Sequence, residues 1–456
     1  DAFFAAFTLI AFFLLFFSAG TIQGALMPAY QSRIEEGDRP GSVYILRETT
    51  LVVLVIACIV ALLVWIFAPH MVNGVFAGFG AKTRQHAIVF TRLLIPIVVL
   101  GSLGAIFQSV LHSRREFLSP AIIPILNNAV ILTSVLVASS SLGVTALAIG
   151  FCLGYLPWLL LLGPLVAPDY RGYAERRPRS MSTISISFLF LSGIIIIDQF
   201  SNVFQRSLLS RFEPGIISTF TYGTKIAGLP IGIIVGALAS VIFPRFVSAI
   251  NSGNTEEIGH ALRRGLVAVL TLLFPISAFL YLEATLVIAT LFGRDNLGSA
   301  GFTNTITVLK IYALLIPAQA LILLYTRALI AATRNRYLLL NIICAGLFHI
   351  GITWALVRWL GWIGVPIGTF VYAYFHSALF LMTSGLLAKP DFIDMSASLV
   401  RLCTAIVLSL TGTLLVGGDD YLWTAVRVGI MGILYFGSLA LMRESELRDL
   451  ILERVR

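Results

Sequence analysis

Long apolar runs separated by short polar stretches fill almost the whole chain. Each run is long enough for a transmembrane helix, which needs about 20 apolar residues. None of them alternates between apolar and polar positions, as the strands of a transmembrane barrel do. The pattern therefore predicts an all-α polytopic membrane protein with thirteen helices. The runs lie at residues 2–30, 49–69, 88–112, 119–138, 142–166, 183–209, 217–246, 263–292, 305–332, 337–357, 361–388, 398–416 and 421–442.

The composition supports this fold class. The chain has 456 residues, of which 58% are hydrophobic and 12% are charged. Soluble domains average about 45–50% apolar and about 25% charged residues, so a soluble globular protein and a disordered one are both excluded. The sequence holds no hydrolase, metalloprotease or nucleotide-binding motif, and its four cysteines lie inside apolar runs without the spacing of a metal site. We therefore expect neither an enzyme nor a metal site.

Basic residues are distributed unevenly between the loops. The chain has 31 Lys and Arg against 22 Asp and Glu, a formal net charge of +9. When the loops are numbered from the first, the odd loops and the C-terminal tail hold nineteen basic residues and the even loops hold six. Because cytoplasmic loops are enriched in Lys and Arg, we expect the odd loops and the C-terminus to be cytoplasmic. Nucleic acid is not an expected partner, since the chain has neither a basic run nor a soluble domain.

This orientation bears on the start of the chain. It places Asp1 on the outer side, and no charged segment precedes the first apolar run. We therefore expect that a preceding helix is missing, and with it the number of spans would be fourteen.

The sequence contains a candidate internal repeat. Leu-Leu-Ile-Pro occurs at 93–96 and again at 314–317, an offset of 221, and residues 20–30 pair with residues 236–246 at an offset of 216. Chance similarity among apolar residues is the alternative. The repeat predicts two lobes of six helices with a substrate path between them, as in transporters built from parallel repeats. The expected domains are an N-lobe (1–166), a cytoplasmic linker (167–182), a C-lobe (183–388), and two extra helices with a cytoplasmic tail (389–456).

Some basic residues fall inside the apolar runs, where charges are costly and usually face a cavity or a partner. They are Arg92, Lys225, Lys310, Arg327, Arg401 and Arg427. The last two and Lys310 lie near helix ends, where long side chains reach the interface. Lys225, Arg92 and Arg327 belong to lobe helices and are candidates to bind an anionic substrate such as a phosphate or pyrophosphate. The alternative for these three is packing against helix carbonyl groups or a single acid.

Acidic and imidazole groups inside the runs are the candidates for ion coupling. Asp198 interrupts an isoleucine run and could carry a proton or Na⁺, or neutralise Lys225. Glu283 is the other candidate acid. His349 and His376 are also intramembrane, with hydrogen-bonded packing as the alternative. No cofactor is expected, and coupling to Na⁺, to H⁺ or to the membrane potential stays open.

Several stretches resemble the MurJ (MviN) family. The stretch from Leu93 to Phe117, followed by Ser119-Pro120 and on to Asn127, resembles a characteristic part of that family. Residues 222–246 resemble its eighth helix, and residues 291–294 and 327–331 resemble later motifs.

The resemblance implies a lipid II flippase of the bacterial inner membrane, in the multidrug/oligosaccharidyl-lipid/polysaccharide exporter superfamily, with a role in cell-wall biogenesis and cell shape. It implies fourteen helices in two lobes around a central cavity, whose arginines bind the pyrophosphate. It also implies that transport proceeds by alternating access. The two C-terminal helices would hold the lipid tail. The implied partners are a lipid-linked glycan with a pyrophosphate head group, membrane lipids, and candidate proteins of cell-wall synthesis.

The sequence departs from the family at several implied site positions. Leu14 and Leu15 stand where the family has an arginine pair, and Lys225 stands where it has an arginine. A sodium-site aspartate of some members aligns with Gln205, and His376 stands where the family often has Asn. Gln205, His376 and Asp198 are therefore the ion-coupling candidates. These departures leave three alternatives open, namely flipping of another lipid-linked oligosaccharide in exopolysaccharide synthesis, drug/cation antiport, and a membrane scaffold that transports nothing.

Overall fold

The structure is a computed structural model that describes residues 1–17, 22–174, 193, 196–197, 199–235, 255–293, 296–332, 334–384, 392–414 and 421–441. Helices, joined by turns and short loops, make up this part of the chain. Where they are described, the apolar runs at which transmembrane helices were predicted are helical apart from short turns, as at Ile95, Gly143 and Glu283. The chain divides into two compact units, at residues 1–217 and 218–456. The predicted lobe boundaries remain a prediction.

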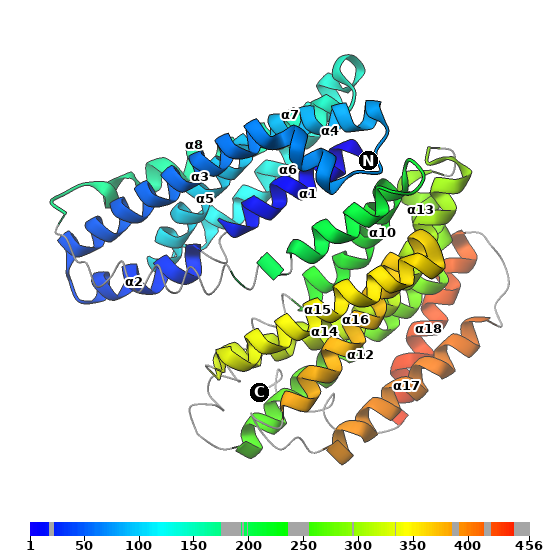
Figure 1. Cartoon of the computed structure of the whole chain (residues 1–456). Helices are drawn as coiled ribbons and strands as arrows, with labels where there is room; N and C mark the ends of the chain where they lie inside the picture. Colours follow the sequence, from blue (N-terminus) through cyan, green and yellow to red (C-terminus); the bar gives the residue numbers. More distant parts are fainter. Residues whose placement is uncertain are drawn as a thin grey trace. The chain divides into compact units, whose positions relative to one another are not determined.

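Unit 1 is a bundle of long and short helices (Figure 1). Residues 199–209 are helical as well and belong to it. Its labelled elements are α1 (Ala2–Phe16), α2 (Gly24–Glu35), α3 (Arg39–Val75), α4 (Ala81–Leu94), α5 (Pro96–Ser113), α6 (Leu118–Leu142), α7 (Val144–Gly154), α8 (Leu156–Val166) and the 3₁₀ turn η2 (Ala167–Tyr170).

Unit 2 is a second helical bundle, in which α17 and α18 lie side by side (Figure 1). Its first helix, α10, begins at the boundary between the units. The elements are α10 (Ile216–Pro230), the π-helical turn η3 (Ile231–Val235), α12 (Thr255–Leu282), α13 (Ala284–Phe292), α14 (Gly298–Ala331), α15 (Asn335–Leu360), the 3₁₀ turn η4 (Gly361–Ile363), α16 (Gly364–Ser384), α17 (Phe392–Leu414) and α18 (Tyr421–Leu441).

Seven helical segments of the described residues are long and apolar enough to cross a membrane. They are Arg39–Val75, Ala81–Ser113, Leu118–Leu142, Val144–Tyr170, Glu257–Leu282, Gly298–Ile330 and Arg336–Thr383. Many large apolar side chains on them are exposed, as Leu132, Leu136 and Val137 on α6 are. Water-soluble proteins rarely expose continuous apolar surface of this kind, whereas helices that satisfy their own backbone groups can present it to lipid. The predicted polytopic all-α class is confirmed.

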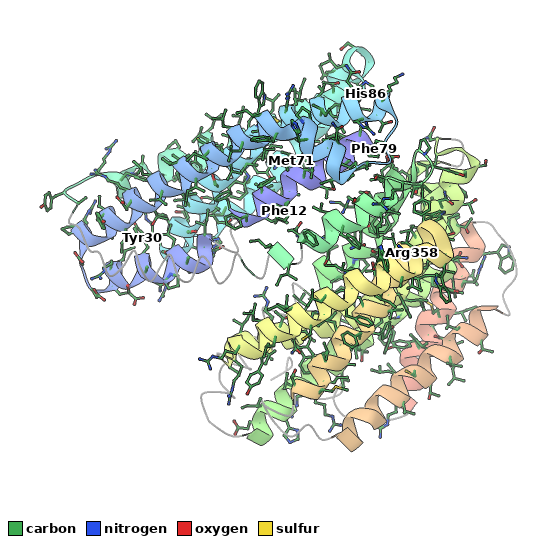
Figure 2. All side chains as sticks on the ribbon, viewed as in Figure 1. Phe12, Tyr30, Met71, Phe79, His86 and Arg358 are labelled. Carbon is green, nitrogen blue, oxygen red and sulfur yellow. The ribbon has the colours of Figure 1, made fainter. Side chains whose placement is uncertain are left out.

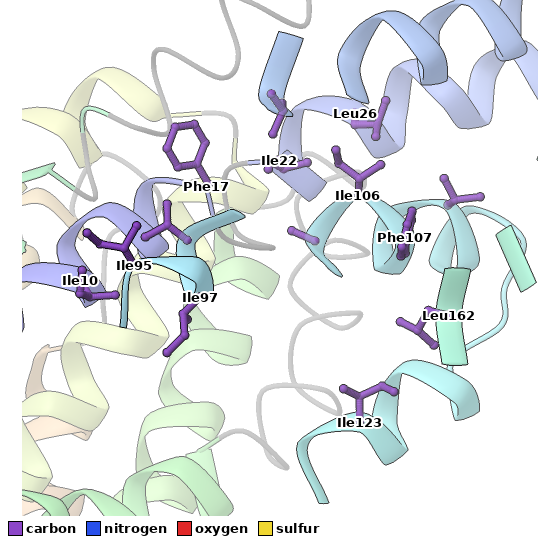
Figure 3. Packing of buried hydrophobic residues seen from close by; sticks show 14 of the residues in the cluster. Ile10, Phe17, Ile22, Leu26, Ile95, Ile97, Ile106, Phe107, Ile123 and Leu162 are labelled. Carbon is purple, nitrogen blue, oxygen red and sulfur yellow. The ribbon is translucent and has the colours of Figure 1, made fainter. Parts of the chain in front are cut away.

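One apolar cluster forms the core of unit 1 and joins helices that are far apart in sequence. Figure 3 shows Ile10 of α1, Leu26 of α2, Phe107 of α5 and Leu162 of α8 among its members. Leu14, one of the two positions where the resemblance implies an arginine, is half-buried against this cluster. Its Cδ1 lies so close to Gly101 of α5 that a side chain on that glycine would collide with it. Leu14 thus fills the contact between α1 and α5 with an apolar side chain.

The two last helices pack on α12 of unit 2. A small cluster holds them there, made of Leu270 from α12, Leu402 and Ala405 from α17, and Tyr435 and Leu439 from α18. Its members are almost fully buried, the hydroxyphenyl ring of Tyr435 completely so. Burial of apolar side chains contributes about 25 cal/mol per Å², so this cluster contributes to the attachment of α17 and α18.

Candidate functional site

Lys225 is an exposed cation on α10. Its neighbours Ile226 and Ala227 are buried, so the helix turns the lysine away from the packed face of unit 2. Within the described part of the chain, its ammonium group has no hydrogen bond and no ion pair. The group is therefore available to an anionic ligand.

Arg327 is a second available cation in unit 2. It lies in the last third of α14, between buried Tyr325 and Ala328, and its own side chain is exposed. The guanidinium group has no partner among the residues that the structure describes. It presents up to five N–H donors, in a geometry that suits the oxygens of a pyrophosphate.

Arg92 is engaged by a neighbouring helix. Its Nε donates to the backbone carbonyl of Trp65 at 3.2 Å, and its Cζ lies 4.8 Å from the centre of the Trp65 ring. Trp65 precedes Pro69 by four residues on α3. Because proline has no N–H, the Trp65 carbonyl loses its normal helical donor, and Arg92 supplies one. This contact supports packing against a carbonyl, the alternative considered for Arg92, while its substrate role remains a prediction.

The ion-coupling candidates near residue 200 belong to unit 1. Gln205 is buried, 5% exposed, in the helical stretch 199–209. Its Nε2 donates to the carbonyl of Ser201, one turn earlier, at 3.3 Å. Asp198 lies outside the described residues. The ion-coupling role of Asp198 and Gln205 therefore remains a prediction.

His376 sits in a buried column of rings on α16. Its Nδ1 lies 3.2 Å from the Tyr372 hydroxyl, and its ring stacks on Phe380 with centroids 4.7 Å apart. Its Nε2 is buried with no hydrogen-bond partner among the described residues. His349 of α15 stacks on the other side of the column, on Tyr372 at 4.2 Å, and lies 3.3 Å from Thr369 Oγ1. His349 thus fits hydrogen-bonded packing, whereas His376 keeps one open ring nitrogen.

Glu283 forms an ion pair that spacing along the sequence does not reveal. Its Oε1 lies 2.9 Å from Nη1 of Arg427, and both side chains are largely buried, at 9% and 21% exposure. Glu283 lies at the junction of α12 and α13, and Arg427 lies on α18. A candidate acid of the bundle is therefore used to hold one of the two last helices.

Unit 1 also contains a cavity of about 350 Å³ where α3 begins and α8 ends. Asp169 lines it, accepts a hydrogen bond from the Tyr30 hydroxyl at 2.9 Å and forms an ion pair with Arg114. Figure 2 shows Tyr30 on α2 near this end of unit 1. Arg39 lines the same cavity. Sequence reasoning placed these arginines in cytoplasmic loops but gave no signal for the network around Asp169.

Comparisons with known proteins give one consistent result. The family described as "Lipid II flippase MurJ" matches residues 1–437. A "Probable lipid II flippase MurJ" of Rhizobium meliloti (strain 1021) is 26% identical over 337 residues, which are 71% of this chain and 62% of the relative. The corresponding protein of Thermotoga maritima is 22% identical over 457 residues, 98% of this chain and 90% of the relative. The chain thus aligns with about three fifths of the Rhizobium protein.

Solved structures show the same fold. "Lipid II flippase MurJ, inward closed conformation" matches with a TM-score of 0.82 at 19% identity, over 99% of this chain and 93% of that one. An inward-facing multidrug resistance MATE family transporter of the MOP superfamily matches with a TM-score of 0.73 at 15% identity, over 85% of this chain and 91% of that one. The chain therefore has the same fold as these two proteins. Because the family match extends over almost the whole sequence, the chain belongs to the MurJ family of multi-pass membrane proteins.

Proposed function

We propose that this chain moves lipid II, the undecaprenyl-pyrophosphate-linked peptidoglycan precursor, from the inner to the outer leaflet of the bacterial cytoplasmic membrane. The family match over residues 1–437 is the observation that carries the proposal. Transport would proceed by alternating access, with the lipid tail remaining in the bilayer. The C-terminus would be cytoplasmic, as the distribution of basic residues predicts.

The available cations of unit 2 support an anionic head group. A charged side chain at the centre of a membrane helix costs about 2.5–3.5 kcal/mol on insertion scales. Lys225 lies well inside its helix without a described partner, and Arg327, four residues before the end of α14, has none either. A pyrophosphate would offset the cost of such charges. Lysine binds as a point charge and arginine as a planar fork. Lys225 would therefore attract the pyrophosphate, and Arg327 would orient it.

The membrane potential favours one direction of movement for the empty binding site. Moving one charge through the potential is worth about 2.3 kcal/mol per 100 mV. With the outside positive, an empty cationic site returns more easily to the inner side. A pyrophosphate neutralises the site on the outward step. The roles of Asp198, Gln205 and His376 in coupling to Na⁺ or H⁺ are part of this proposal.

A second candidate function is flipping of another lipid-linked oligosaccharide. The observation that favours it is the apolar packing of Leu14 against Gly101, at a position where the resemblance implies an arginine. The loss of this charge changes the groups that recognise the head group. It also motivates the scaffold alternative, in which the chain recruits cell-wall synthesis proteins and transports nothing.

Proteoliposomes that contain the full chain test these alternatives. Fluorescent lipid II is placed in the membrane, and its movement between leaflets is followed with an impermeant quencher. We expect transport well above empty liposomes for the parent protein and a loss for Lys225→Ala. Absence of lipid II transport together with movement of another undecaprenyl-linked glycan would replace the first proposal by the second. Absence of transport with every lipid would favour the scaffold.

A further inference from the structure

The repeated Leu-Leu-Ile-Pro motif has a structural counterpart in each unit. In unit 1, the motif ends α4 and begins α5, and the carbonyl of its first residue, Leu93, accepts from Sγ of Cys152 on α7 at 3.0 Å. In unit 2, the carbonyl of the first residue, Leu314, accepts from the hydroxyl of Tyr374 on α16 at 2.9 Å. The two donors are 222 residues apart, almost the same offset as the two motifs. The two copies of the motif thus share a tertiary hydrogen bond, from a side chain of another helix to the carbonyl of their first residue.

The proline of the second motif leaves one carbonyl of α14 without its helical donor. Pro317 lies inside α14, and it has no N–H to give to the carbonyl of Ala313, four residues earlier. Ser277 of α12 donates its hydroxyl to that carbonyl at 2.6 Å, and both groups are buried. A carbonyl left without a donor inside a membrane costs several kcal/mol, and neighbouring hydroxyl side chains are one way to satisfy it.

Three side chains from neighbouring helices donate to backbone carbonyls of α14 next to Pro317. Ser277 belongs to α12, whereas Tyr374 and Ser377 belong to α16. The Ser377 hydroxyl lies 3.1 Å from the carbonyl of Ala318. In unit 1, the motif at 93–96 accepts from one weak donor, the Cys152 thiol, and α4 ends within this motif. The stronger donors of unit 2 accompany a helix that continues through the proline.

We propose that Ser277 and Tyr374 are positioning residues that fix the direction of α14 beyond Pro317 and thereby place Arg327. The inference rests on the proposed function. Arg327 lies ten residues beyond the proline, about 15 Å along a helix. Sharp helix kinks exceed about 20°, so a change of that size moves Arg327 by about 5 Å. Hydrogen bonds between an arginine and a phosphate oxygen need about 2.7–2.9 Å between heavy atoms, and they do not survive such a shift.

A pair of substitutions separates positioning from stability. Ser277→Ala leaves the Ala313 carbonyl without a donor, and adding Pro317→Ala restores a helical N–H to it. The double variant should therefore melt like the parent, but α14 would take a new direction. We expect its lipid II flipping to stay at least about tenfold below the parent, the loss of one hydrogen bond to a charged group. Recovery of flipping together with stability would overturn the inference.

Two further variants test whether the effect passes through Arg327. In an Arg327→Ala background, Ser277→Ala/Pro317→Ala should reduce flipping no further, because the side chain being placed is already gone. Ser277→Thr keeps the hydroxyl and should flip like the parent. Thr271→Val is the matched control, since the Thr271 hydroxyl on the same helix bonds only within it, to Val267. An additional loss in the Arg327→Ala background would overturn the inference.

A distance measurement tests the inference without transport. Spin labels are attached at positions 327 and 347, an exposed site on α15, after Cys58, Cys344 and Cys403 are changed to Ala and Cys152 to Ser. We expect the distance distribution of Ser277→Ala/Pro317→Ala to shift or broaden by about 5 Å relative to the parent. An unchanged distribution would overturn the inference even if lipid II is the substrate. A shift combined with absence of lipid II transport by the parent would instead refute the proposed function.

Discussion

The ion pair between Glu283 and Arg427 should control the attachment of α18. Glu283→Gln keeps the shape of the side chain but removes the carboxylate that pairs with the largely buried Arg427. At 2.9 Å and an effective dielectric constant of about 20, the two charges attract each other by about 6 kcal/mol before their desolvation is counted. Removal of one partner of a buried pair typically costs about 3–5 kcal/mol. We therefore expect Glu283→Gln to destabilise the helix-packing contacts of α18 by about 3 kcal/mol.

Hydrogen–deuterium exchange of the purified protein in detergent measures this loss locally. Peptides from 421–441 should exchange faster in Glu283→Gln, whereas peptides from α4 and α5 in unit 1 should exchange at the parent rate. Glu283→Met/Arg427→Met replaces both charges by apolar side chains, and it should restore much of the protection because neither charge has to be buried at this contact. Unchanged exchange of α18 in Glu283→Gln would refute the reasoning, as would an equal loss in the double variant.

Three further predictions concern single side chains. Lys225→Ala should reduce lipid II flipping at least about tenfold while Lys225→Arg retains it, and an equal loss in both would exclude charge as the cause. Arg92→Met should lower stability in a thermal melt by about 1–3 kcal/mol because the Trp65 carbonyl loses its donor. In a Pro69→Ala background, where a helical N–H is available to that carbonyl, the loss should be smaller. Equal losses in both backgrounds would contradict the role of Arg92 as donor to Trp65. Leu14→Arg should lower the melting temperature because a charge enters an apolar contact, and an unchanged melt would show that the α1–α5 contact accommodates it.

Much of the fold was predictable because helix formation in a membrane is a local property. A run of about 20 apolar residues must satisfy its backbone groups internally, so its length alone predicts a helix. The runs at 49–69 and 119–138 are helical as predicted. Prolines limited this approach at the helix boundaries, since the single run at 88–112 is two helices joined at Pro96.

The candidate site was only partly accessible to such reasoning. The sequence indicated which cations lie inside the membrane, because a charge in an apolar run is visible without a structure. It could not indicate which of them have partners. Arg92 and Trp65 are 27 residues apart, and Glu283 and Arg427 are 144 apart. Their contacts depend on how separate helices pack.

The sequence by itself thus determined the membrane class, the helical runs, the repeated motif and the resemblance to the MurJ family. The tertiary structure decided how the polar groups are used. Arg92 satisfies a carbonyl that Pro69 leaves free, Glu283 holds α18, and Ser277 and Tyr374 donate to carbonyls of α14 next to Pro317. Lys225 and Arg327 remain available among the described residues. The physical reason is that helix formation depends on neighbours along the chain, whereas hydrogen bonds and ion pairs between helices depend on atoms that only packing brings within about 3 Å.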